Sequence, residues 1–421
     1  MSQQESSTLN LLQGTALSLG SIIGSGLLFL SALSYKVGGS HLFYGWILSI
    51  FITIPLIILF CQMVKKYKNA SPIGDLWGDT LGQHFSHYLP YLMLFTTLWG
   101  IPCSLYIVSQ YVSEIIHLPA IFITLFMLAL AYGINFSGLK VSARTQLIIT
   151  LIFFILAFIL YGHTFSPLSF TKIFPSIEGP LHWKKIFNVA LLSFWAFAGV
   201  ENLSFLSRKF KNPNRDFPLS IGISFTLCAF LYWGLTSNYV ATIPYQTINE
   251  KTGLLQLTTY FSYQSLFMNM ISLMAFLSVL MNLISWILGL SEMISSSAKK
   301  GIFPFLLQGK KAMIFLLFGQ LFFSFLLYAN ESLLNFFIGS VSANFVLIYF
   351  ISAFCFFLQE HTLSKKIIIA FIVLLLFLAL YSSLSFLWYA SFLYITSSLI
   401  YFIKQKREEK KSIFIHKENI T

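Results

Sequence analysis

Apolar stretches of about twenty residues recur along the whole chain, and a helix of that length crosses a hydrocarbon core of about 30 Å. A β-barrel strand would alternate apolar and polar positions over about ten residues, whereas the stretch 147–161 is apolar on every side. Only 10% of the 421 residues are charged, against about a quarter in soluble proteins. The sequence therefore predicts an all-α membrane protein and excludes a soluble enzyme, a secreted disulfide scaffold and a disordered chain.

Charged residues and prolines divide the chain into twelve predicted spans. The connections are short, so residues 1–403 are predicted to form one transmembrane domain, and 404–421 a basic cytoplasmic tail. The first apolar stretch is too long for a signal peptide and is kept as a span. The spans are expected at 9–36, 41–64, 88–113, 119–138, 145–163, 185–208, 217–241, 262–297, 312–329, 333–358, 365–383 and 386–403.

The net charge of +12 is interpreted as a signal of membrane topology. With the N-terminus inside, 21 of the 26 Lys and Arg residues fall in predicted cytoplasmic segments, as the positive-inside rule requires. Both termini are therefore expected in the cytoplasm. No segment outside the membrane combines a basic face with aromatic stacking positions, so nucleic acid is not an expected partner.

Two predicted spans carry matching interruptions, Gly-Ser-Gly at 24–26 in span one and Gly-Val-Glu at 199–201 in span six. These spans open two groups of five, at about 9–163 and 185–358. Because five is odd, the second group enters the membrane from the opposite side, and the groups would be related by inversion. Matching breaks of this kind point to a transporter site at mid-membrane. The helices at 365–403 lie outside the repeat and are expected to serve packing or homodimer contacts.

The first break has the composition expected of a site for a zwitterion. Gly24 and Gly26 let the backbone leave the helical conformation at a cost of about 1 kcal/mol each. Amides freed at the start of the next half-helix would attract a carboxylate, and freed carbonyls an ammonium group. The alternative is a small-residue face for close helix packing. The matching break in span six favours the binding site.

Glu201 is the only acidic residue deep in a predicted span. Because an ionisable group is costly at that depth, it is a functional hypothesis by default. Glu201 is predicted to carry a proton, to organise the break by accepting hydrogen bonds from freed amides, or to make a purely structural hydrogen bond. An intramembrane enzyme would need a second titratable group facing it. No metal-ligand spacing or nucleotide motif occurs, so no metal and no cofactor are expected.

Residues 194–201 read Phe-Trp-Ala-Phe-Ala-Gly-Val-Glu, and 211–218 read Lys-Asn-Pro-Asn-Arg-Asp-Phe-Pro. Both resemble the sixth span and following loop of the amino acid/polyamine/organocation (APC) transporter family. The Gly-Ser-Gly break matches the family's binding motif, and 298–304 is similar to the loop after its eighth span. The resemblance covers essentially the whole chain. Phe217 and the compact length favour the bacterial branch that exports methionine and branched-chain amino acids.

The resemblance implies a LeuT-like fold with an amino acid bound between broken helices one and six. It places the substrate carboxylate at Ser25 and Gly26 and the ammonium group at backbone carbonyls, with Trp195 as a gate. Trp286, fifteen residues before Gly301, would stack on the substrate. For both tryptophans, packing toward lipid is the alternative. The substrate-binding residues implied are Ile22, Ile23, Gly24, Ser25, Gly26, Trp195, Ala198, Gly199 and Trp286.

One departure concerns the coupling ion. Some sodium-independent members carry a lysine in span five, but residues 147–162 contain no charge. H+ coupling, Na+ coupling and pure exchange therefore stay open. Oxygens of Ser278, Asn282 or Ser285 are candidate sodium ligands, although hydroxyls in apolar helices more often bond their own backbone.

The sequence thus predicts a secondary transporter for a small apolar amino acid, in the inner membrane of a bacterium and acting by alternating access. Its expected partners are the amino acid and the lipid bilayer. The alternatives are an exchanger of polyamines or charged amino acids, and an amino acid sensor that keeps the fold without transporting.

Overall fold

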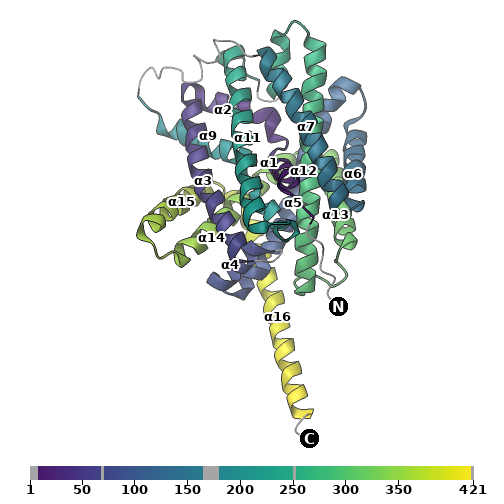
Figure 1. Ribbon diagram of the computed structural model, residues 1–421, viewed down its shortest axis with the longest axis vertical. Helices are drawn as coiled ribbons and strands as arrows, with labels where there is room; N and C mark the ends of the chain where they lie inside the picture. The colour runs from purple at the N-terminus through teal and green to yellow at the C-terminus, as the bar shows by residue number, and fades with distance from the viewer. Residues whose placement is uncertain (1–7, 68–70, 165–179, 250–252, 419–421) are drawn as a thin grey trace.

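The computed structural model describes residues 8–67, 71–164, 180–249 and 253–418, and its regular elements are helices (Figure 1). The α-helices are α1 (Leu11–Ile22), α2 (Gly26–Gly38), α3 (Leu42–Lys66), α4 (Pro72–Leu81), α5 (Gln83–Ile116), α6 (Ala120–Phe136), α7 (Leu139–Thr164), α9 (Trp183–Phe194), α10 (Val200–Ser204), α11 (Pro213–Thr242), α12 (Gln264–Lys299), α13 (Lys310–Ala329), α14 (Leu333–Gln359), α15 (Leu363–Ser382) and α16 (Trp388–Glu418). The 3-10 helices are η1 (Gly39–His41), η2 (Trp195–Phe197), η3 (Ser207–Lys209), η4 (Tyr245–Thr247), η5 (Gly253–Tyr260) and η6 (Leu384–Phe386).

Within the described ranges, nine helical stretches are long and apolar enough to cross a membrane, and α1 and α6 are shorter apolar helices. The expectation of an all-helical membrane protein is confirmed. The last helix, α16, continues beyond the predicted end of the span at residue 403, as far as Glu418. The added residues are rich in Lys, Glu and Arg, which are strong helix formers in water. In Figure 1, α16 extends away from the other helices.

Helices α5 and α12 form the buried centre of the molecule. In their most apolar stretches, 83% of α12 and 78% of α5 is buried, against 22% of α15. Helix α1 packs against α7, α11 and α12, while α9 packs against α3. Since α15 is among the most hydrophobic helices and yet the most exposed, its surface is suited to lipid.

Basic segments that are distant in sequence lie at one end of the helix bundle. Lysine side chains from four of them contact other segments there, and the pairs are Lys66 with Gln359, Lys209 with Glu292, Lys300 with Asp75, and Lys404 with the carbonyl of Gly301. The amides of Thr8 and Leu9 both donate to the carbonyl of Lys209 at 2.9 Å, which brings the start of α1 to the same end. At the far end of α2, the backbone carbonyl of Lys36 accepts a hydrogen bond from the Tyr245 hydroxyl at 3.0 Å.

Glycine allows α3 and α9 to approach closely. A Cβ added at Gly45 would lie 2.4 Å from Val189 Cβ and 2.9 Å from the carbonyl oxygen of Ile186. Both neighbours belong to α9, so backbone as well as side chain would have to move.

We therefore expect Gly45→Ala to destabilise the protein by about 1–3 kcal/mol, the usual cost of overpacking. The measurement is the midpoint of thermal unfolding in detergent. The matched control is Gly133→Ala on α6, where an added Cβ would have no neighbour within 4 Å. Equal midpoints for the two variants would show that the α3–α9 contact does not depend on Gly45.

Candidate functional site

The first predicted helix break is present. Helix α1 ends at Ile22, and Ile23 is extended (φ −79°, ψ 118°) before α2 begins at Gly26. No side chain caps the start of α2. The hydroxyl of Ser25 instead lies 3.2 Å from that of Ser104 on α5. The amides of Leu27 and Leu28 donate to the carbonyls of Gly24 at 3.2 Å and Ser25 at 3.1 Å, which leaves the amide of Gly26 at the start of α2 for a ligand.

The second break lies a few residues earlier than predicted. After α9 the chain forms the turn η2, then Ala198 is extended and Gly199 takes φ 123°. Val200 and Glu201, predicted within the break, already belong to α10. A Cβ at Gly199 would lie 2.3 Å from the carbonyl oxygen of Ser21. Glycine is therefore required both by its backbone conformation and by the close approach of the two breaks.

A cavity of about 70 Å³ lies between the breaks. It has room for more than one water molecule, and none of its lining side chains is charged. The lining residues are Ser21, Ile22, Gly24, Ser25, Gly26, Thr96, Thr97, Gly100, Ile101, Ser104, Trp195, Ala198, Tyr232, Asn282, Trp286, Val341 and Phe345.

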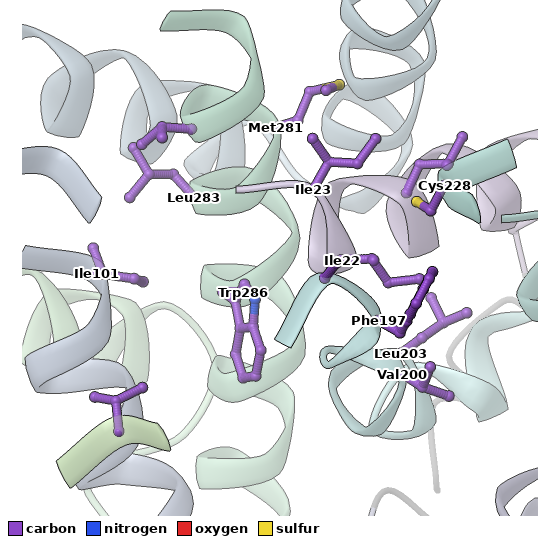
Figure 2. Close-up of a cluster of buried hydrophobic side chains, with 14 of the residues drawn as sticks. Ile22, Ile23, Ile101, Phe197, Val200, Leu203, Cys228, Met281, Leu283 and Trp286 are labelled. Carbon is purple, nitrogen blue, oxygen red and sulfur yellow. The ribbon is translucent and has the colours of Figure 1, made fainter. Parts of the chain in front are cut away.

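Most of the implied substrate-binding residues meet at this cavity. Figure 2 shows Trp286 on α12 between Ile101 of α5 and Ile22 at the end of α1. Ile23 and Gly199 do not line the cavity: the side chain of Ile23 is fully buried in the core, and Gly199 lies against α1. The implied residues that do line it are Ile22, Gly24, Ser25, Gly26, Trp195, Ala198 and Trp286.

From the sequence, the substrate side chain was expected to point toward spans three, eight and ten, which correspond to α5, α12 and α14, but no lining residue of α5 or α14 was named. Thr96, Gly100 and Ser104 follow one another at four-residue intervals on α5, so they share one helix face. This run of small and polar residues in an apolar helix was the available signal. Val341 and Phe345 on α14 line the cavity beside α5, since a Cβ at Gly100 would lie 3.4 Å from Val341 Cγ1, and no local feature of the sequence marks them.

Glu201 lies outside the cavity and stabilises the second break through hydrogen bonds. Its side chain is fully buried, and Oε2 accepts hydrogen bonds from the amide of Gly199 at 3.2 Å and from the hydroxyl of Tyr349. The Gly199 amide also lies 3.3 Å from the Tyr349 hydroxyl oxygen. This is the arrangement that the break-organising alternative requires.

Side chains of α12 bond to the end of α1. Asn282 Nδ2 donates to the carbonyls of Gly20 at 3.0 Å and Ser21 at 3.2 Å, and Trp286 Nε1 donates to Ser21 at 3.1 Å. Of the candidate sodium ligands, Asn282 thus presents hydrogen atoms toward α1. The Ser278 hydroxyl donates to the carbonyl of Ala275 in its own helix at 2.8 Å. In the described part of the chain, no cluster of His, Cys, Asp and Glu has the composition of a metal site.

Comparison with known proteins shows which sequences this chain is similar to. The chain is 28% identical over 247 residues to the L-methionine/branched-chain amino acid exporter YjeH of Escherichia coli K12. It is 24% identical over 296 residues to the uncharacterized amino acid permease YecA of Bacillus subtilis, and 23% identical over 261 residues to its branched-chain amino acid permease BcaP. These alignments cover 58%, 70% and 55% of this chain, and 58%, 69% and 54% of the relatives.

The chain therefore spans somewhat more than half the length of the exporter that it matches. The relatives are permeases and an exporter, which points away from an enzyme. The family model for amino acid permeases matches residues 9–403, which is most of the chain. The protein belongs to the amino acid permease family.

Proposed function

We propose that the protein is a secondary active transporter of a small apolar amino acid, such as methionine or a branched-chain amino acid, and that it works by alternating access. The observation that carries the proposal is an uncharged cavity that lies between two broken helices. The names of the exporter and of the branched-chain permease among its relatives agree with this substrate class.

The backbone supplies the groups that would bind the charged ends of the substrate. The uncapped amides at Ser25 and Gly26 would take the carboxylate, with the favourable end of the α2 dipole behind them. The carbonyls near Ile22 and Ala198 would take the ammonium group. The side chain would point toward α5 and α14, and Trp195 would close over the bound substrate.

The membrane arrangement follows from pairing the half-helices. If α1 with α2 and α9 with α10 each make one crossing, then α3, α5, α6, α7, α11, α12, α13, α14, α15 and α16 bring the total to twelve. The inverted repeats would then cover about 9–163 and 185–358, with α15 and α16 as accessory helices that could mediate a homodimer. The end that gathers the basic segments would face the cytoplasm. The bacterial relatives support an inner-membrane location.

The rival functions make different demands on the site. A polyamine or cationic amino acid needs a carboxylate for its extra charge, and the cavity lining contains none. A sensor would bind the same amino acid without moving it. Measurements of flux distinguish both of these rival functions from the proposed one.

We expect counterflow of labelled leucine or methionine in proteoliposomes that are preloaded with either amino acid. Excess unlabelled leucine should abolish the signal, whereas arginine and putrescine should leave it unchanged because nothing in the lining pairs with a second cation. Competition by arginine would favour the rival exchanger. Binding of leucine without any counterflow would favour the sensor.

We expect Gly26→Leu to abolish counterflow while the protein remains folded. A Cβ at this position would lie 3.0 Å from Leu30 Cδ1 and 3.7 Å from the Tyr232 hydroxyl, and a longer side chain would fill the cavity. The control is Gly222→Leu on α11, where an added Cβ has no neighbour within 4 Å. Both variants are compared by elution from a sizing column and by counterflow. Normal transport by Gly26→Leu would refute the site assignment.

We expect Glu201→Gln to retain most exchange and Glu201→Leu to lose it about tenfold or more, because the Gln oxygen still accepts from Gly199 and Tyr349 and leucine leaves both donors unpaired. Counterflow is measured with and without an imposed pH gradient. If Glu201→Gln exchanges normally but no longer responds to the gradient, Glu201 is a proton carrier and the organising role is insufficient.

A further inference from the structure

Tyr232 on α11 has a buried ring and a hydroxyl that lies beside the first helix break. The residue lines the cavity with 1% of its surface exposed. In the part of the chain that the structure describes, its hydroxyl makes no hydrogen bond. A buried tyrosine hydroxyl usually has a partner. This hydroxyl is therefore a polar group at the cavity that the protein itself leaves unpaired.

The ring of Tyr232 is positioned by contacts with α3 and α2. Trp46 of α3 is stacked on it, with 5.7 Å between the ring centroids, and Trp46 Nε1 donates to the Ser34 hydroxyl of α2 at 3.3 Å. One turn further along α11, the hydroxyl oxygen of Thr236 lies 3.0 Å from that of Ser31, also on α2. These contacts join α11 to α2, so the Tyr232 hydroxyl has a defined place relative to the first break.

That place is next to the amide that the start of α2 leaves for a ligand. A Cβ added at Gly26 would lie 3.7 Å from the Tyr232 hydroxyl oxygen, and the Gly26 amide is the one not taken up by the first turn of α2. A tyrosine hydroxyl can donate one hydrogen, and each carboxylate has two oxygens that accept. The amide and the hydroxyl can therefore donate to the same carboxylate.

The other hydroxyls of the cavity lining have partners in the protein. Those of Ser21, Thr96 and Thr97 donate to carbonyls of their own helices, and Ser25 and Ser104 share one hydrogen bond. Among the described residues, no Lys, Arg or His side chain lines the cavity, so a carboxylate bound there has to be stabilised by hydrogen bonds alone. The hydroxyl of Tyr232, which has no protein partner there, is available to make one of them.

We propose that Tyr232 is a substrate-binding residue, and that its hydroxyl donates to the substrate carboxylate together with the amide of Gly26. This inference rests on the proposed function and adds α11, an unbroken helix, to the elements that bind the substrate. The carboxylate is common to all amino acids. Tyr232 therefore determines how tightly amino acids bind as a class, whereas the preference among their side chains is determined elsewhere in the cavity.

The test removes the hydroxyl and keeps the ring. In Tyr232→Phe, the half-saturating concentration of leucine should rise about tenfold or more, as expected for a lost hydrogen bond to a charged group. Methionine and valine should weaken by the same factor, because all three present the same carboxylate. The thermal midpoint measured without substrate should not fall, because the hydroxyl has no protein partner to lose. Half-saturating concentrations are measured by counterflow and by the rise of the thermal midpoint with added amino acid.

The matched control is Tyr132→Phe on α6, whose buried hydroxyl donates to Gln320 Oε1 at 2.9 Å outside the cavity. It should lower the thermal midpoint and leave the half-saturating concentration of leucine unchanged.

Three results with Tyr232→Phe overturn the inference: an unchanged half-saturating concentration of leucine, unequal losses among the three amino acids, or a lower thermal midpoint without substrate, which includes a failure to fold. In each case the proposed function stands as long as the wild type binds and exchanges leucine. If the wild type binds leucine without counterflow, transport fails as the function, and the thermal titration still decides the role of Tyr232. If the wild type binds no amino acid, both proposals fail.

Discussion

A peptide group freed inside the bilayer needs a partner in the protein or in a cavity that it borders, because lipid supplies none. This constraint decides how the two helix breaks are built. At the first, the carbonyls of Gly20 and Ser21 are bonded by side chains of α12. At the second, the amide of Gly199 is bonded by Glu201. The groups left over, at the start of α2 and at Ile22, border the cavity, so the binding surface is defined by what the protein leaves unpaired.

The two breaks also constrain each other. Gly199 lies so close to the carbonyl of Ser21 that even one methyl group would not fit between them. Asn202 on α10 adds a second link, since its amide donates to the Ser21 hydroxyl and to the carbonyl of Ser285, both at 2.9 Å. Helices α1, α10 and α12 are therefore joined around one residue. A movement that opens the cavity must either carry these three segments together or exchange this set of hydrogen bonds for another.

Features that depend on local composition could be predicted from the sequence, and those that depend on partner helices could not. The break near Gly24 follows from the conformational freedom of glycine, and it lies where expected. The second break was placed too late because Glu201 was taken as part of it, although the residue lies in the first turn of α10 and accepts a hydrogen bond from the amide of Gly199, directly before that helix. Asn282 was considered as a sodium ligand because the sequence does not show which way its amide points. That direction depends on carbonyl groups of a different helix, α1. The end of α16 could not be predicted from hydropathy, because hydropathy indicates whether a segment lies in lipid or in water and not whether it is helical.

The proposed binding site is uncharged, and this determines how much work a membrane potential can do on it. A zwitterionic amino acid carries no net charge, and the cavity that would hold it contributes none. Glu201 keeps its hydrogen bonds to Gly199 and Tyr349 outside the cavity, so its contacts do not depend on the substrate. The loaded and empty sites then differ by no charge. A membrane potential does work of about 2.3 kcal/mol per elementary charge for each 100 mV, and on such a site it does none. On such a site, the direction of net movement would be set by the amino acid gradients together with the gradient of any coupled ion.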